Sequence, residues 1–178
     1  MAKLNERTDE TKKIIHIMIT DKCNRKCPDC CNNQYDINLI ERVTAEELRE
    51  AEIIFLTGGE PFAYYPDPCS LAHKIKQTYP NIKQVMIYTN AYELVTYLKM
   101  GGVLHDLDGL TISIKSKKDM EAIKYLIEHD SLKNIVSIRT YVFDGFQTYI
   151  PANWDPVVEY GRKILNLQQI VYLGGCNG

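Results

Sequence analysis

The sequence predicts an α/β fold with a parallel sheet, and two observations support that prediction. Short apolar runs rich in β-branched residues, such as residues 14–20, alternate with segments of helical periodicity along the chain. Strands that are apolar throughout are typical of a parallel sheet, and the helices between them supply its crossovers. Six such units are compatible with an open sheet or a partial barrel, and composition does not choose between these two arrangements.

Six strands and five helices are expected, and several of their ends carry specific signals. Thr44 and Glu47 form a capping box at the first helix, and Gly101 follows the third. Asp155 as cap, with Pro156 in the first turn, predicts the start of the last helix. The expected strands are residues 14–20, 53–57, 85–89, 110–115, 135–142 and 170–173, and the other helices are residues 44–51, 70–79, 91–100 and 117–128.

Length and composition indicate one ordinary globular domain. The 178 residues fit a single domain over 1–178, with 1–13 expected to be a flexible N-terminal segment. No apolar run approaches the roughly 20 residues that span a bilayer, and the polar start lacks the apolar stretch of a secretory signal. The net charge of −2 provides no bulk attraction to a phosphate backbone. We therefore expect a cytoplasmic protein with no membrane or nucleic-acid partner.

Three cysteines stand close together directly after the first expected strand. Cys23, Cys27 and Cys30 form a CxxxCxxC array in a loop of polar and turn-forming residues. Clustered thiols in a cytoplasmic chain bind metal more often than they form disulfides. Three cysteines on a 4Fe-4S cube leave one iron free to bind a small molecule, whereas structural zinc needs four ligands. The array therefore favours a 4Fe-4S cluster.

The remaining cysteines leave two alternatives open. Cys31 adjoins the array but breaks its spacing, and Cys69 and Cys176 lie far away in the sequence. A zinc site completed by Cys31 or by a distant histidine is one alternative, and buried cysteines without metal are the other. We interpret these three cysteines as ordinary thiols.

Further candidate residues follow the next strands. Strand 53–57 is followed by Gly58, Gly59, Glu60 and Pro61, and the local interpretation of these residues is a tight turn and the start of a helix. Asn90 follows strand 85–89, and it also suits the N-cap of the next helix.

The next two strands carry polar residues among apolar ones. Ser113 and Lys115 share one face by the two-residue period, and polar groups pointing inward need partners. Arg139 lies within an apolar strand, where it either finds an anionic partner or reaches solvent.

The cysteine array and the Gly-Gly-Glu-Pro motif resemble those of the radical S-adenosylmethionine (SAM) superfamily, and the resemblance extends strand by strand over nearly the whole chain. It implies a partial (β/α)6 TIM-like barrel with Cys23, Cys27 and Cys30 as ligands of a 4Fe-4S cluster. In that family the open iron binds SAM, and one electron from the cluster cleaves SAM to a 5′-deoxyadenosyl radical that abstracts hydrogen from a substrate.

The same resemblance implies the residues that bind SAM. A backbone carbonyl of the glycine pair and the Glu60 carboxylate would contact its amino group. Asn90 resembles the Thr-Asn that closes this strand in activating enzymes of glycyl radical enzymes. Ser113 and Lys115 would make polar contacts with the ribose or carboxylate, and Arg139 would bind the carboxylate.

Two departures from the family pattern are visible. The activating enzymes carry Asp-x-Lys where this chain has Ser113-x-Lys115, and Asp29 replaces an aromatic residue that stacks on adenine in many members, with Tyr35 as a candidate substitute.

Three functions consequently remain open. The first is a radical enzyme acting on a protein or peptide; a radical enzyme of any kind would need an electron donor such as flavodoxin or ferredoxin. The second is a radical enzyme acting on a small molecule such as a nucleotide or deazapurine. The third is a non-catalytic zinc or iron-sulfur binding module.

Overall fold

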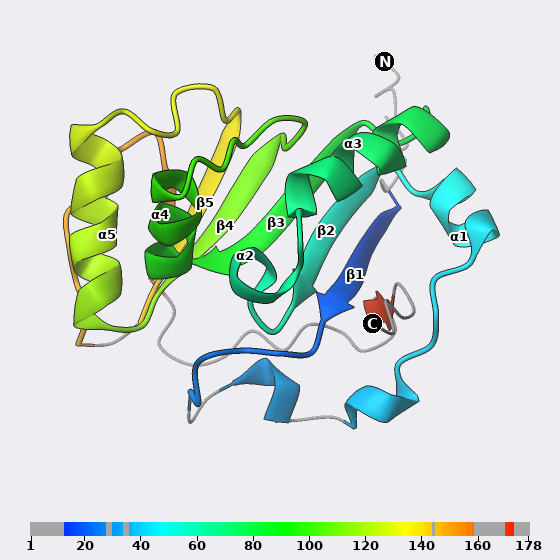
Figure 1. Cartoon of the computed structure of the whole chain (residues 1–178), viewed down its shortest axis with the longest axis horizontal. Coiled ribbons are helices and arrows are strands. Elements are labelled where there is room, and N and C mark those ends of the chain that lie inside the picture. Colours follow the sequence, from blue (N-terminus) through cyan, green and yellow to red (C-terminus); the bar gives the residue numbers. More distant parts are fainter. Residues whose placement is uncertain (1–12, 28–29, 34–35, 144, 159–169, 173–178) are drawn as a thin grey trace, which may run out of the picture.

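A single parallel sheet organises the chain (Figure 1). The computed structural model describes residues 13–27, 30–33, 36–143, 145–158 and 170–172. The strands are β1 (Ile14–Thr20), β2 (Ile53–Gly58), β3 (Gln84–Asn90), β4 (Gly109–Ile114), β5 (Ser137–Val142), β6 (Asp155–Val158) and β7 (Ile170–Tyr172). The helices are α1 (Ala45–Glu50), α2 (Pro61–Tyr64), α3 (Pro68–Thr78), α4 (Ala91–Lys99) and α5 (Lys117–Glu128), with 3-10 turns η1 (Cys31–Asn33) and η2 (Ile37–Leu39).

Strands β1 to β6 stand side by side in chain order. The sheet order is β6-β5-β4-β3-β2-β1-β7, and every pair is parallel. The carboxyl ends of the strands therefore lie along one edge of the sheet, where the loops after β1, β2, β3 and β4 meet. This edge receives the cysteine loop.

The core lies between the sheet and the helices drawn in front of it in Figure 1. Alternate strand residues such as Ile17, Leu56 and Ile112 are fully buried in one cluster with Leu94 of α4 and Ile123 of α5. Each such side chain stabilises the fold by about 1.5–3 kcal/mol relative to its exposed state. The helices thus anchor the strands whose ends carry the candidate site.

The α/β class and five of the six predicted strands are confirmed in place, and the capping box of Thr44 and Glu47 is present. The sheet of the described residues is open, since β6 and β7 form its two edges. Curvature into a partial barrel stays a prediction.

The predicted helix start at Asp155 is wrong, because Asp155–Val158 form strand β6 beside β5. The rest of that predicted helix, over residues 159–169, lies outside the described residues. Asp-Pro begins many helices, but Pro156 is also tolerated in an edge strand, and the β-branched Val157 and Val158 favour a strand. The described residues of the connection before β6 contain no helix, and Trp154 is buried there.

The last predicted strand exists as β7 but lies beside β1, at the edge opposite to β6. If all six predicted strands had paired in chain order, this strand would lie next to the fifth one.

Among the described residues, no helix is both long and apolar enough to cross a membrane.

Candidate metal centre

The cysteine loop follows β1 at the carboxyl edge of the sheet. Cys23 is exposed, Cys27 and Cys30 are half-buried, and all three are free thiols. The Cys30 N–H donates to the Cys27 carbonyl at 3.1 Å, so the backbones of these two cysteines lie close together. Although Cys23 is exposed to solvent, desolvation by the protein around its thiol, followed by the nearby charges of Glu60, Cys27 and Cys30, raises the pKa of that thiol. Cys27 and Cys30 therefore lie near enough to act on the Cys23 thiol.

The thiols fit a 4Fe-4S cluster in kind and in spacing but have not converged on a common point. In the described part of the chain, no three Cys, His, Asp or Glu side chains come close enough to hold a metal ion. Three free, accessible thiols on one loop are nonetheless the donor set of a cube with one open iron. Binding would draw the cysteine side chains together.

The two glycines at the end of β2, Gly58 and Gly59, support the backbone of this loop. The Gly59 N–H donates to the Thr20 carbonyl at 2.7 Å, and the Glu60 N–H donates to the Lys22 carbonyl at 2.9 Å. A Cβ on Gly59 would lie 1.9 Å from the Lys22 carbonyl oxygen, and one on Gly58 would lie 2.0 Å from that of Thr20. Only glycine permits this approach, and Gly58 also has a φ of +134°. The tight-turn interpretation of the pair is thus confirmed, with the cysteine loop as the neighbour.

Glu60 is a buried carboxylate held by the end of β3. It is 3% exposed, and it accepts hydrogen bonds from the Thr89 hydroxyl at 2.6 Å and the Asn90 N–H at 2.9 Å. The Asn90 side-chain amide also donates to it. Burial raises the pKa of Glu60 to about 7, although these hydrogen bonds oppose the rise. The carboxyl group is therefore poised to change charge near neutral pH.

This pKa predicts a fall in stability as the pH rises. Folded Glu60 holds its proton more tightly than the unfolded chain does, so the group favours folding below its ordinary pKa of 4.5 and loses that contribution as the pH passes 7. The loss amounts to at most about 3 kcal/mol. We expect urea unfolding of the metal-free chain at pH 5 and pH 8 to show a larger fall for the wild type than for Glu60→Gln. Equal falls in the two proteins would contradict a raised pKa.

Asn90 is the N-cap of α4, as its local interpretation predicted, and it also joins two loops. Its side-chain oxygen accepts from the Glu93 N–H at 3.0 Å and from the Arg25 guanidinium at 2.9 Å, while its amide donates to Glu60. Asn90 consequently connects the cysteine loop with the glutamate after β2.

Arg25 and Asp119 belong to the site, but they were not predicted as site residues from the sequence. Arg25 stands between Cys23 and Cys27, and its guanidinium donates to both oxygens of Asp119, at 2.5 and 2.8 Å. Asp119 lies in the first turn of α5 and is fully buried. The Ser116-x-x-Asp119 spacing is a capping signal and offers no hint of a partner 94 residues away.

The remaining predicted residues contact other parts of the fold or are exposed. The Ser113 hydroxyl donates to the Thr89 carbonyl at 3.3 Å, and the Lys115 ammonium lies 4.6 Å from the centre of the Phe143 ring. Pro61 is buried in the first turn of α2, and Arg139 is exposed on β5. Their predicted contacts with SAM stay predictions.

Some sequence-based assignments lie outside the described residues. These are the replacement of an adenine-stacking residue by Asp29, the substitute role suggested for Tyr35, the thiol role of Cys176, and residues 1–12 of the predicted flexible segment. Cys69 is buried in α3, which agrees with a core thiol.

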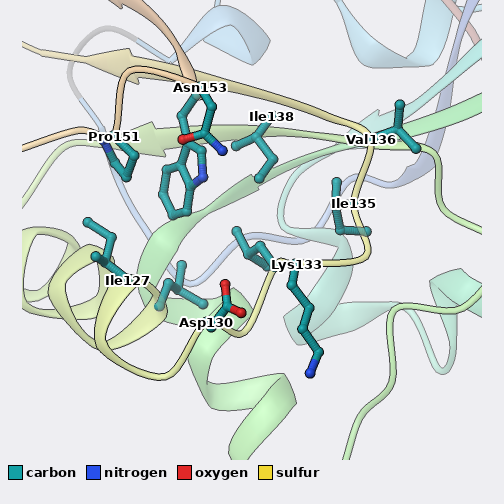
Figure 2. A pocket seen from close by; sticks show the side chains of 11 residues that line it. Ile127, Asp130, Lys133, Ile135, Val136, Ile138, Pro151 and Asn153 are labelled. Carbon is teal, nitrogen blue, oxygen red and sulfur yellow. The ribbon is translucent and has the colours of Figure 1, made fainter.

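A cavity of about 350 Å³ lies on the side of the sheet where the strands begin, opposite to the carboxyl edge that carries the cysteine loop. Figure 2 shows Ile127, Ile135 and Ile138 around it, with Asp130 and Lys133 at its side. Ile135 and Val136 precede β5, so the cavity borders the amino end of that strand and is separate from the cysteine loop.

The chain thus has a parallel α/β sheet with a loop of three free cysteines at its carboxyl edge. Thiolates are the ligands that iron-sulfur clusters use, so these features indicate an iron-sulfur protein of the α/β class. Residues 14–136 match the model of the family described as a 4Fe-4S single cluster domain, and the chain belongs to this family. The match runs from β1 to the approach of β5 and includes Cys23, Glu60 and Asp119. No curated protein and no solved structure matches the chain. The family supports a 4Fe-4S cluster as the cofactor.

Proposed function

We propose that this protein is a radical SAM enzyme in which Cys23, Cys27 and Cys30 hold the 4Fe-4S cluster. The observation that carries the proposal is the hydrogen-bonded contact between the cysteine loop and the Gly58-Gly59-Glu60 turn. This contact holds the cysteine loop against the turn that carries the buried Glu60 carboxylate. Bound to the three thiols, the cluster would supply the electron for reductive cleavage of SAM and an open iron to which SAM binds.

Glu60 is the proposed partner of the SAM amino group. An ammonium beside a buried carboxyl favours its charged form, so SAM binding would lower the raised pKa of Glu60. The Thr89 hydroxyl and the Asn90 N–H hold the carboxylate in one orientation. An oriented carboxylate binds a cation without a further loss of side-chain entropy.

We further propose that the strands form a partial barrel and that hydrogen is abstracted from a protein or peptide. The consecutive order of β1 to β6 supports the barrel, because such an order lets a sheet curve in one direction. Thr89-Asn90 at the end of β3 supports a relation to the activating enzymes. A small-molecule substrate is the alternative.

SAM binding tests the role of Glu60. In the cluster-loaded protein, Glu60→Gln should weaken SAM binding about tenfold or more, because a charged hydrogen bond is replaced by a neutral one. The measurement is a titration of SAM against the EPR signal of the reduced cluster. Glu52→Gln, just before the other end of β2, is the matched control and should bind SAM like the wild type. If Glu60→Gln also binds SAM like the wild type, Glu60 has only a structural role.

A further inference from the structure

Arg25 occupies an unusual position, since it stands inside the cysteine array yet its side chain turns away to a distant helix. Its guanidinium forms a bidentate ion pair with Asp119 and donates hydrogen bonds to the Ser116 hydroxyl at 3.4 Å and the Asn90 side-chain oxygen at 2.9 Å. Arginine suits this geometry because its planar fork matches a carboxylate, which the single ammonium of lysine cannot do. The side chain of Arg25 is 18% exposed and that of Asp119 is 0% exposed.

Asp119 is a fixed anchor for this arginine. Besides the guanidinium, its oxygens accept from the Tyr92 N–H at 3.1 Å, the Lys115 N–H at 3.0 Å and the Ser116 hydroxyl at 2.8 Å. Burial alone would raise the pKa of Asp119, but the hydrogen bonds, led by those from Arg25, bring it below the ordinary value. The anchor therefore stays charged and is held by the first turns of both α4 and α5.

A second contact ties down the residue before Arg25. The Asn24 side-chain amide donates to Glu93 of α4. Two adjacent residues between Cys23 and Cys27 are thus bonded to elements that follow β3 and β4, whereas Lys26, the third, is exposed. The loop between the first two cysteines is clamped on one side.

From this geometry we infer that Arg25 is a positioning residue that holds the cysteine loop against α4 and α5 before any cluster binds. The inference deepens the proposed function and rests on its assignment of the three cysteines as ligands. Through Asn90, the same guanidinium links the loop to Glu60. Arg25 thereby fixes the distance between the cluster ligands and the carboxylate proposed for SAM.

Thiol labelling of the metal-free, full-length chain tests this directly. The rates at which iodoacetamide modifies the individual cysteines are followed by peptide mass spectrometry for the wild type, Arg25→Met and Lys26→Met. Arg25→Met should raise the rates at Cys27 and Cys30 about tenfold or more, because local opening exposes these half-buried thiols. Lys26→Met should match the wild type. Buried Cys69 reports global unfolding and should stay slow in all three proteins.

Cluster assembly provides the second readout. After reconstitution, Arg25→Met should bind less iron per chain than Lys26→Met, and Arg25→Lys should not restore it. Unchanged rates at Cys27 and Cys30 in Arg25→Met would overturn the inference.

A rise at Cys69 as well would show that unpaired Asp119 unfolds the chain, and a double variant then decides. Arg25→Met with Asp119→Leu removes both charges, so no unpaired charge stays buried and the bond between the loop and α5 is still absent. Fast labelling of Cys27 and Cys30 with slow Cys69 supports positioning, and wild-type rates overturn it. Because labelling needs no cluster and no SAM, its outcome is independent of whether the wild type cleaves SAM.

Discussion

Replacement of Cys27 by alanine is expected to abolish cluster binding and all SAM cleavage while the α/β fold remains intact. Two cysteines cannot hold a 4Fe-4S cube in place of three, so the iron content should fall to background. The fold should survive because Cys27 is half-buried and stands outside the core cluster. Iron and sulfide analysis after anaerobic reconstitution measures the first effect, and circular dichroism measures the second.

Cys31→Ser is the matched control for this experiment. Cys31 is the nearest other thiol in the sequence, and its position outside the CxxxCxxC spacing predicts that its loss leaves the cluster and SAM cleavage unchanged. A full cluster in Cys27→Ala, or a lost one in Cys31→Ser, would contradict the assigned ligands.

Alanine at Gly59 is expected to push the cysteine loop away from the sheet. The added Cβ would meet the Lys22 carbonyl at 1.9 Å, and backbone atoms on both sides must shift to relieve the contact. Overpacking of this kind costs roughly 1–3 kcal/mol of the free energy of unfolding. We expect that loss in urea unfolding, together with a reduced iron content after reconstitution.

Gly101→Ala separates backbone strain from displacement of the loop. Gly101 has a φ of +89°, and nothing lies within 4 Å of its Cβ position, so alanine there costs about 1 kcal/mol by strain alone. It follows α4, away from the cysteines, and should keep a full cluster. A full cluster in Gly59→Ala would show that the glycine contact does not position the loop.

Most of the fold was predictable because the strands carry their own signal. Runs such as Ile53–Gly58 are apolar and β-branched, and the helices between them have clear caps. The error at Asp155 arose because an Asp-Pro pair starts a helix and also fits an edge strand. The place of β7 beside β1 could not be predicted, since strand order at an edge depends on contacts between distant segments.

The site was predictable only where its chemistry has a local spacing. The cysteine array and the glycine pair could be recognised within a few residues of sequence. The pairing of Arg25 with Asp119 could not, because each residue alone resembles a surface charge and only the fold brings them together. Likewise, the N-cap role of Asn90 was visible locally, but its bonds to Glu60 and Arg25 were not.

The formation of 5′-deoxyadenosine tests the central claim most directly. The protein is reconstituted anaerobically with iron and sulfide, reduced with dithionite in the presence of SAM, and analysed by chromatography. We predict 5′-deoxyadenosine from the wild type and none from variants that lack Cys23, Cys27 or Cys30. A wild-type protein with a full cluster that forms no 5′-deoxyadenosine would contradict the proposed radical chemistry and would favour a binding module.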